Sequence, residues 1–219
     1  METLSAARAL FLNAFEIAPP LVNRINGLRE ALFGGRFMLG VHYRGTDKKL
    51  EAERVPYETV LESVRAALDQ AALALGGEVG VFIATDEAAF AEAALRSLAP
   101  FTVVTAPGAQ RSLDGKPIHQ SKRDCSPGLA EQAMIDCLLL SHCDAILKTP
   151  SMLSGWATLL SGRPTLMWGS PKSDRMFFPD SLVLRQAYVL GNERQLISEA
   201  LADRTKEADR ASRSGIAGD

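Results

Sequence analysis

Short apolar runs alternate with longer amphipathic segments along most of the chain. Apolar runs with the length and composition of buried β-strands lie at 37–43, 79–84, 101–105, 145–148 and 165–168. Between them, apolar positions recur at helical spacing over about 56–75, 88–98, 128–142 and 151–160. Strands that alternate with helices of this length are typical of parallel βαβ units. We therefore predict an α/β fold, a Rossmann-like parallel sheet of about five strands flanked by helices.

The segments outside this alternation are also predicted to be mostly helical. Residues 4–33 show helical periodicity with a break at Pro19-Pro20, and 192–212 are predicted to form a last helix. A short strand near 182–184 is a further expectation. Residues 106–127 show no periodicity, which is typical of a long functional loop. The predicted organisation is an N-terminal helical segment (1–36), a Rossmann-like domain (37–190), and a C-terminal helix and tail (191–219).

Composition and charge narrow the classes of function. The net charge of -2 and the pI of about 6.0 argue against a nucleic-acid binder, whose domains are usually strongly basic. The Gly-x-Gly-x-x-Gly fingerprint and the Walker phosphate loop are both absent from the sequence. The three cysteines form no Cys-x-x-Cys pair, so we expect no zinc site and a reducing, cytoplasmic setting. The apolar runs are too short to predict a membrane span.

Polar side chains cluster after three of the predicted strands. His42 and Arg44 follow the first strand, Asp86 follows the second, and Ser151 and Ser154 begin the helix after the fourth. Because the carboxyl ends of parallel strands meet at one edge of a sheet, we expect these side chains to converge there. An arginine beside a helix N-terminus suits a diphosphate group.

Several of these side chains, and their neighbours Asp47 and Lys48, also have a purely structural explanation. Asp86 and Ser151 are plausible N-caps of the helices that follow them. His42 fits a half-buried, hydrogen-bonded histidine, and Asp47 fits a partner of Arg44. Lys48 is the kind of side chain that usually lies in solvent. The shared position of the cluster at one sheet edge is what favours a binding site.

Three segments resemble the donor-binding domain of a glycosyltransferase family. They are Gly40–Lys48, Val81–Glu87, and Ile135–Asp144 with its continuation to Ser151. In this order they resemble the α-1,6-fucosyltransferase and rhizobial chitin-oligosaccharide fucosyltransferase group, which is related to protein O-fucosyltransferases. The resemblance spans about residues 37–160. It implies the C-terminal, Rossmann-like half of a GT-B fold, with metal-independent, inverting transfer of fucose from GDP-fucose to a hydroxyl acceptor.

The resemblance also implies roles for individual residues. Arg44 would hold the β-phosphate and stabilise the leaving diphosphate, while His42 and Asp136 would contact the guanine nucleoside. Ser151 would bind phosphate, with Ser154 as a second candidate. A carboxylate at position 136 suits this role because it can accept from both guanine N1–H and the guanine amino group. No metal or other cofactor is expected.

The chain departs from the family at two positions of the phosphate clamp. Where the family has a second arginine after Arg44, this chain has Gly45. Where the family has paired serines, this chain has Ser151-Met152.

The acceptor-binding half of a GT-B enzyme normally precedes the donor half, so the expectation is a truncated enzyme, a minimal relative, or a donor domain completed by a partner chain. The apolar helix pair at 4–33 packs either within the chain or across a homodimer. A non-catalytic module that binds GDP or a nucleotide-sugar is the alternative function, and a Rossmann-like phosphatase is a third. The residues leave the general base open among Asp47, Asp86 and Glu87.

Overall fold

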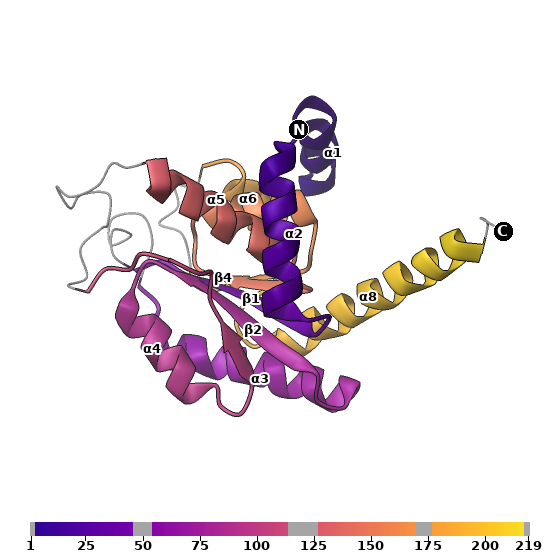
Figure 1. Cartoon of the computed structure of the whole chain (residues 1–219). Coiled ribbons are helices and arrows are strands. Elements are labelled where there is room, and N and C mark those ends of the chain that lie inside the picture. The colour runs from indigo at the N-terminus through magenta and orange to yellow at the C-terminus, as the bar shows by residue number, and fades with distance from the viewer. Residues whose placement is uncertain (1–2, 46–53, 114–126, 170–176, 217–219) are drawn as a thin grey trace.

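A five-stranded parallel sheet forms the centre of the computed structural model, with the strand order β3-β2-β1-β4-β5 (Figure 1). The structure describes residues 3–45, 54–113, 127–169 and 177–216. The strands are β1 (Phe37–Tyr43), β2 (Val79–Thr85), β3 (Thr102–Val104), β4 (Ala145–Lys148) and β5 (Thr165–Met167). The predicted Rossmann-like parallel sheet is confirmed. The chain leaves β1 toward β2 and later returns to place β4 on its other side, which is the arrangement that opens a crevice at the carboxyl ends of such strands.

Helices cover both faces of the sheet. On one face lie α3 (Tyr57–Leu75), α4 (Ala88–Ser97) and the first half of α8 (Glu193–Ile216), and on the other lie α2 (Pro19–Phe33), α5 (Pro127–Ser141) and α6 (Met152–Ser161) (Figure 1). The first helix, α1 (Leu4–Ala14), packs on α6 and β5. The second half of α8 projects away from the sheet (Figure 1). None of the helices in the described part of the chain is long and apolar enough to cross a membrane.

Side-chain alternation along the strands fixes which residues face which helices. In β1, Leu39 and Val41 pack with α3 and α4, whereas Met38 packs with α2 and α5. Because successive side chains of a strand point to opposite faces, His42 projects on the α5 and α6 side. The same period carries Arg44, which follows the strand, toward that side. The side of the sheet on which His42 and Arg44 lie is therefore set by the strand period.

The segment predicted as a strand near 182–184 is helical, so that prediction is wrong. A short helix, α7 (Asp180–Val183), occupies it, and Leu182 and Val183 are buried against α1 and β5. The free edge of β5 pairs instead with Tyr188, through an isolated bridge to Leu166. An apolar run this short does not distinguish a strand from a buried helical turn.

Candidate functional site

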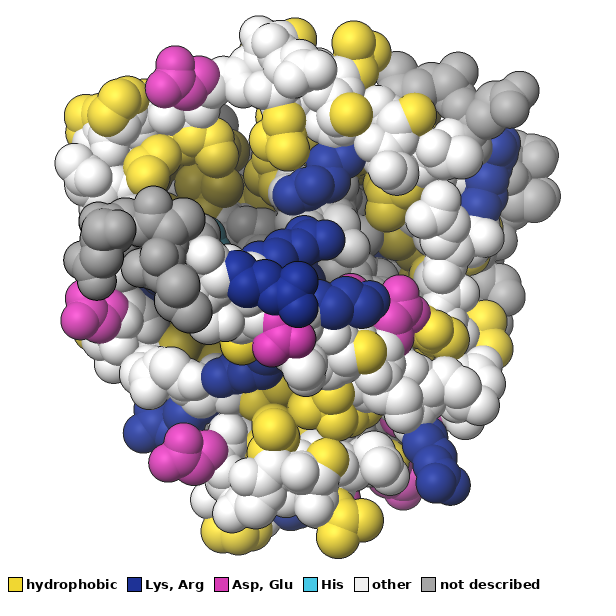
Figure 2. Space-filling model, turned by 90° about the vertical axis from the view of Figure 1, so that its right-hand side faces the viewer, with side chains coloured by type: hydrophobic (Ala, Val, Ile, Leu, Met, Phe, Trp, Pro, Cys, Tyr) yellow, Lys and Arg dark blue, Asp and Glu magenta, His cyan; other side chains and the backbone are white. Residues whose placement is uncertain are grey.

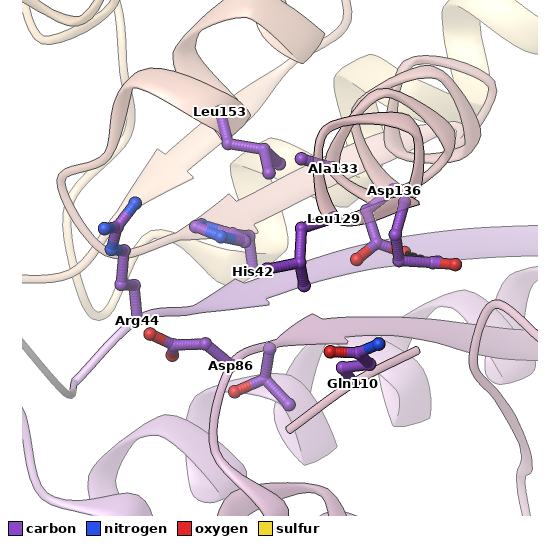
Figure 3. A pocket seen from close by; sticks show the side chains of 10 residues that line it. His42, Arg44, Asp86, Gln110, Leu129, Ala133, Asp136 and Leu153 are labelled. Carbon is purple, nitrogen blue, oxygen red and sulfur yellow. Dashed lines mark hydrogen bonds between the residues drawn. The ribbon is translucent and has the colours of Figure 1, made fainter. Parts of the chain in front are cut away.

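A cavity of about 200 Å³ lies at the carboxyl-end edge of the sheet. Five structural segments line it, namely the ends of β1 and β2, the loop after β3, helix α5 and the first turn of α6 (Figure 3). Its lining side chains are His42, Arg44, Thr85, Asp86, Gln110, Leu129, Gln132, Ala133, Asp136 and Leu153. Four of the six sequence-predicted site residues are among them, namely His42, Arg44, Asp86 and Asp136.

Strand pairing between β1 and β4 fixes the two basic residues of the cavity. The backbone carbonyl of His42 accepts from the Thr149 amide at 3.0 Å, and the Arg44 amide donates to Thr149 Oγ1 at 3.0 Å. Thr149 therefore extends the ladder past the end of β4. This pairing holds the Arg44 backbone beside the first turn of α6, while the Arg44 side chain lies at one end of the cavity (Figure 3).

Backbone hydrogen bonds between the end of β2 and the loop after β3 fix the wall of the cavity that carries Asp86. The Ser112 amide donates to the Asp86 carbonyl at 2.7 Å, and the Ala88 amide donates to the Ser112 carbonyl at 3.1 Å. Asp86 and Gln110 are thereby placed on the same wall of the cavity (Figure 3). The helix N-cap explanation of Asp86 is wrong, because Glu87 is the N-cap residue of α4.

Helix α5 supplies the opposite end of the cavity. Gln132 and Asp136 are four residues apart, so they share one face of the helix, and Gln132 Nε2 donates to Asp136 Oδ1 at 3.4 Å. Burial raises the pKa of Asp136 to about 6, while the Gln132 hydrogen bond and the charge of Arg111 act in the opposite direction. The carboxylate form prevails at neutral pH and is an acceptor for N–H donors.

The two serines at the start of α6 are buried beside the cavity and do not line it. The Ser154 hydroxyl donates to the Ser151 carbonyl at 3.4 Å. Ser151 is the N-cap residue, yet its side chain makes no capping bond, and its buried Oγ has no hydrogen-bond partner in the described part of the chain. A buried hydroxyl in this state is an available donor for an anion at the helix N-terminus.

A buried ion pair holds the β4–α6 turn from the other side. The Lys148 ammonium contacts Asp180 Oδ1, and Asp180 Oδ2 accepts from the Ser151 amide at 2.7 Å. The Lys148 side chain is 0% exposed and that of Asp180 5%. The carboxylate also explains the glycine at position 155, because a Cβ there would lie 2.6 Å from Asp180 Oδ1. Asp180 therefore takes one of the amides at the N-terminus of α6.

Gly45 leaves space for a buried carboxylate next to Arg44. A Cβ on Gly45 would lie 2.1 Å from Glu87 Oε1. Glu87 Oε2 accepts from Arg54 Nη2 at 2.9 Å and from the Tyr57 hydroxyl. An arginine at position 45 would displace this carboxylate. Beside Gly45, Arg54 therefore neutralises the Glu87 carboxylate.

We expect the substitution Gly45→Ala to lower the free energy of unfolding by about 1–3 kcal/mol, the usual cost of forcing extra volume into a packed site. Chemical denaturation measures this value. In the Glu87→Ala background the carboxylate is gone, and the same substitution should cost less than about 1 kcal/mol. An equal cost in both backgrounds would contradict the proposed clash.

Sequence reasoning missed several residues that build this edge. Gln132 could have been predicted as a site residue, because it precedes Asp136 by one helical turn. The pair of Lys148 and Asp180 was not, because its members are 32 positions apart. Asp47 and its neighbours Thr46 and Lys48 lie outside the described residues.

A second, larger cavity of about 870 Å³ lies at the opposite end of the sheet, beside α2 and α8. Basic side chains gather on this face of the molecule (Figure 2). Two of its arginines bind groups of the protein itself. Arg204 donates to the carbonyls of Gly35 and Arg36 and to the Asp144 carboxylate, and Arg163 donates to Glu207. Carbonyls at a helix C-terminus attract cations, so this basic cluster has a structural explanation.

Comparison with known proteins identifies similar solved structures only. No family model and no curated protein matches the chain. NodZ α-1,6-fucosyltransferase co-crystallised with GDP is 26% identical over 71% of this chain, with a TM-score of 0.47. NodZ from Bradyrhizobium is 25% identical over 69% of the chain at 0.46, and an Arabidopsis thaliana FUT1 mutant with GDP is 15% identical over 76% at 0.47. This chain spans 46%, 45% and 37% of those chains, respectively.

Proposed function

We propose that this chain is the donor-binding domain of a glycosyltransferase that uses a GDP-sugar, with GDP-fucose as the donor. One observation carries the proposal: residues from β1, β2 and α5, which the family motifs single out, line one cavity at the edge where such sheets bind ligands. In this proposal Asp136 and His42 contact the nucleoside, and Arg44 contacts the β-phosphate. Ser151 Oγ reaches the diphosphate from the N-terminus of α6.

The transfer chemistry follows from where negative charge develops. When GDP leaves the sugar, charge accumulates on the β-phosphate. A permanently charged guanidinium placed beforehand at that oxygen stabilises the transition state more than the bound donor. The start of α6 adds the positive end of its dipole. Arg44 would thus take the part that a divalent cation plays in other enzymes, so we propose metal-independent, inverting transfer.

The acceptor hydroxyl needs a base, and Asp86 and Glu87 differ in whether they line the cavity. Glu87 is bound to Arg54 and Tyr57, which makes it a poor base. Asp86 lines the cavity and is the base that we propose. Asp86→Asn should preserve GDP binding and abolish sugar transfer and donor hydrolysis. If wild-type protein binds GDP but neither transfers nor hydrolyses any GDP-sugar, the chain is the non-catalytic binding module instead, an alternative favoured by Gly45.

A nucleotide panel tests the proposed ligand class. Thermal shifts are measured with GDP, GDP-fucose, GDP-mannose, UDP and ADP, each with EDTA and with magnesium. A ligand that binds only the folded state raises its apparent stability by mass action. We expect the largest shifts with GDP and GDP-fucose, unchanged by EDTA. No shift with millimolar GDP, or a shift only with UDP or ADP, would refute the proposal.

The half-buried carboxylate of Asp136 predicts opposite effects of one substitution on stability and binding. Its pKa in the folded chain is about 6, above the ordinary value of 3.8. Between pH 3.8 and pH 6 the folded chain therefore binds more protons at Asp136 than the unfolded chain. The contribution of Asp136 to the free energy of unfolding is highest below pH 3.8 and decreases as the pH rises through 6. We expect Asp136→Asn to raise the melting temperature at pH 7 and to change it little at pH 4.

The same carboxylate should make GDP binding depend on pH. Protonated Asp136 offers a donor where guanine also has donors, so the affinity of the wild-type protein for GDP should fall as the pH drops through about 6. Calorimetry at pH 7.5 and pH 5 measures this change. Asp136→Asn should bind GDP weakly at both values. If Asp136→Asn binds GDP with wild-type affinity at pH 7.5, Asp136 does not contact the nucleoside.

A further inference from the structure

We propose that Gln132 recognises the O6 atom of guanine and, together with Asp136, selects the base of the nucleotide. This inference rests on the proposed function, because it assigns the base-recognition residues of the same cavity. Gln132 and Asp136 lie on one face of α5 and both line the cavity. Gln110 lies across from them, on the loop after β3.

The contact between Gln132 and Asp136 determines which hydrogen-bonding groups the two side chains offer to a ligand. Gln132 Nε2 carries two hydrogens, and one of them is directed to Asp136 Oδ1 at 3.4 Å. The second hydrogen remains for a ligand. The ionised Asp136 carboxylate has about four acceptor positions and uses one for Gln132. Along the face of α5, the pair therefore offers acceptors at position 136 and a donor at position 132.

This order of groups is complementary to the Watson–Crick edge of guanine. That edge presents the 2-amino group and N1–H as donors, and O6 as an acceptor. Adenine presents an unprotonated N1 at its centre, and uracil presents a single N–H between two carbonyls. Either base would leave a polar group of the protein without a partner, which is costly in a partly buried site. Guanine satisfies both side chains.

The cavity has the size and the walls that a base requires. Its volume of about 200 Å³ is below the range of roughly 300–1,000 Å³ typical of pockets that hold a whole ligand. It therefore suits one part of a nucleotide. Leu129, Ala133 and Leu153 provide apolar walls for the flat faces of a purine. Arg44 lies at the far end from Asp136, where the diphosphate would leave the cavity (Figure 3).

A pair of ligands that differ at one atom tests the role of Gln132. In 6-thio-GDP sulfur replaces O6, a much weaker acceptor, while N1–H and the 2-amino group remain. Dissociation constants of both ligands are measured by calorimetry for the wild-type protein, Gln132→Leu and Gln132→Ala. Gln195→Leu, the same substitution on an exposed position of α8, is the control. Leucine and alanine are both good helix formers, so α5 should persist.

We expect the wild-type protein and Gln195→Leu to bind GDP about tenfold more tightly than 6-thio-GDP, the worth of one hydrogen bond in such a site. Both Gln132 variants should lose about tenfold in GDP affinity and bind the two ligands equally. If the variants weaken both ligands by the same factor, Gln132 only positions Asp136 and the inference fails while the proposed function stands. If wild-type protein binds neither ligand, both fail.

Discussion

Replacing Arg44 with alanine should abolish most of the affinity for GDP. A charge-assisted, bidentate contact to a phosphate contributes about 1.5–3 kcal/mol, so we expect the dissociation constant to rise roughly 10- to 100-fold. The effect on transfer should be larger, on the order of 10²- to 10³-fold in kcat, because charge on the β-phosphate is greatest in the transition state. Calorimetry with GDP and single-turnover transfer from GDP-fucose measure the two quantities.

Two further variants separate the geometry of Arg44 from its charge. Arg44→Lys keeps the charge and loses the planar fork, so it should recover part of the affinity and little of the rate. Arg194→Ala removes a positive charge from an exposed position of α8 and should leave both quantities within twofold of wild type. If Arg44→Ala binds GDP as the wild-type protein does, the phosphate contact is misassigned.

Breaking the buried pair between Lys148 and Asp180 should produce the largest loss of stability. Asp180→Asn removes the carboxylate that the Lys148 ammonium contacts, in a side chain that is 0% exposed. Removing one partner of a buried pair costs about 3–5 kcal/mol, which corresponds to a decrease in melting temperature on the order of 10 °C for a chain of this size. Denaturant unfolding and calorimetry measure the loss.

A double substitution and an exposed pair serve as controls for this effect. Lys148→Met combined with Asp180→Asn removes both charges and should restore most of the stability, since the asparagine oxygen can still accept from the Ser151 amide. On α4, Glu92 pairs with Arg96 at 3.7 Å in the open. Glu92→Gln should therefore change stability by less than about 1 kcal/mol. Equal effects of Asp180→Asn and Glu92→Gln would mean that burial of the pair does not matter.

The parts of the fold that depend on local patterns were predictable from the sequence. Apolar runs and helical spacing locate the five strands, and the period of β1 sends His42 to the face of α5 and α6. The carboxyl ends of parallel strands lie at the same edge of a sheet, so the convergence of His42, Arg44 and Asp86 was also predictable. Asp136 entered through the family resemblance, since nothing in its local sequence marks a helix position as part of the site.

The parts that depend on packing between distant segments were not predictable. Lys148 is the last residue of β4, and a lysine at a strand end usually reaches solvent, yet α7 returns to bury it beside Asp180. Likewise, Gly45 has the sequence context of a flexible turn residue, and only the position of Glu87 shows why the site lacks a side chain there. Such contacts are set by tertiary structure, which local propensity does not encode.

A crystal structure of the protein with GDP in the presence of EDTA would show directly whether the β-phosphate lies at Arg44 without a metal ion. We expect GDP to place its base in the cavity of about 200 Å³. Its base would pair with Asp136 and Gln132, and its β-phosphate would lie within hydrogen-bond distance of Arg44. GDP bound at the opposite end of the sheet, or bound in this cavity with its diphosphate away from Arg44, would contradict it.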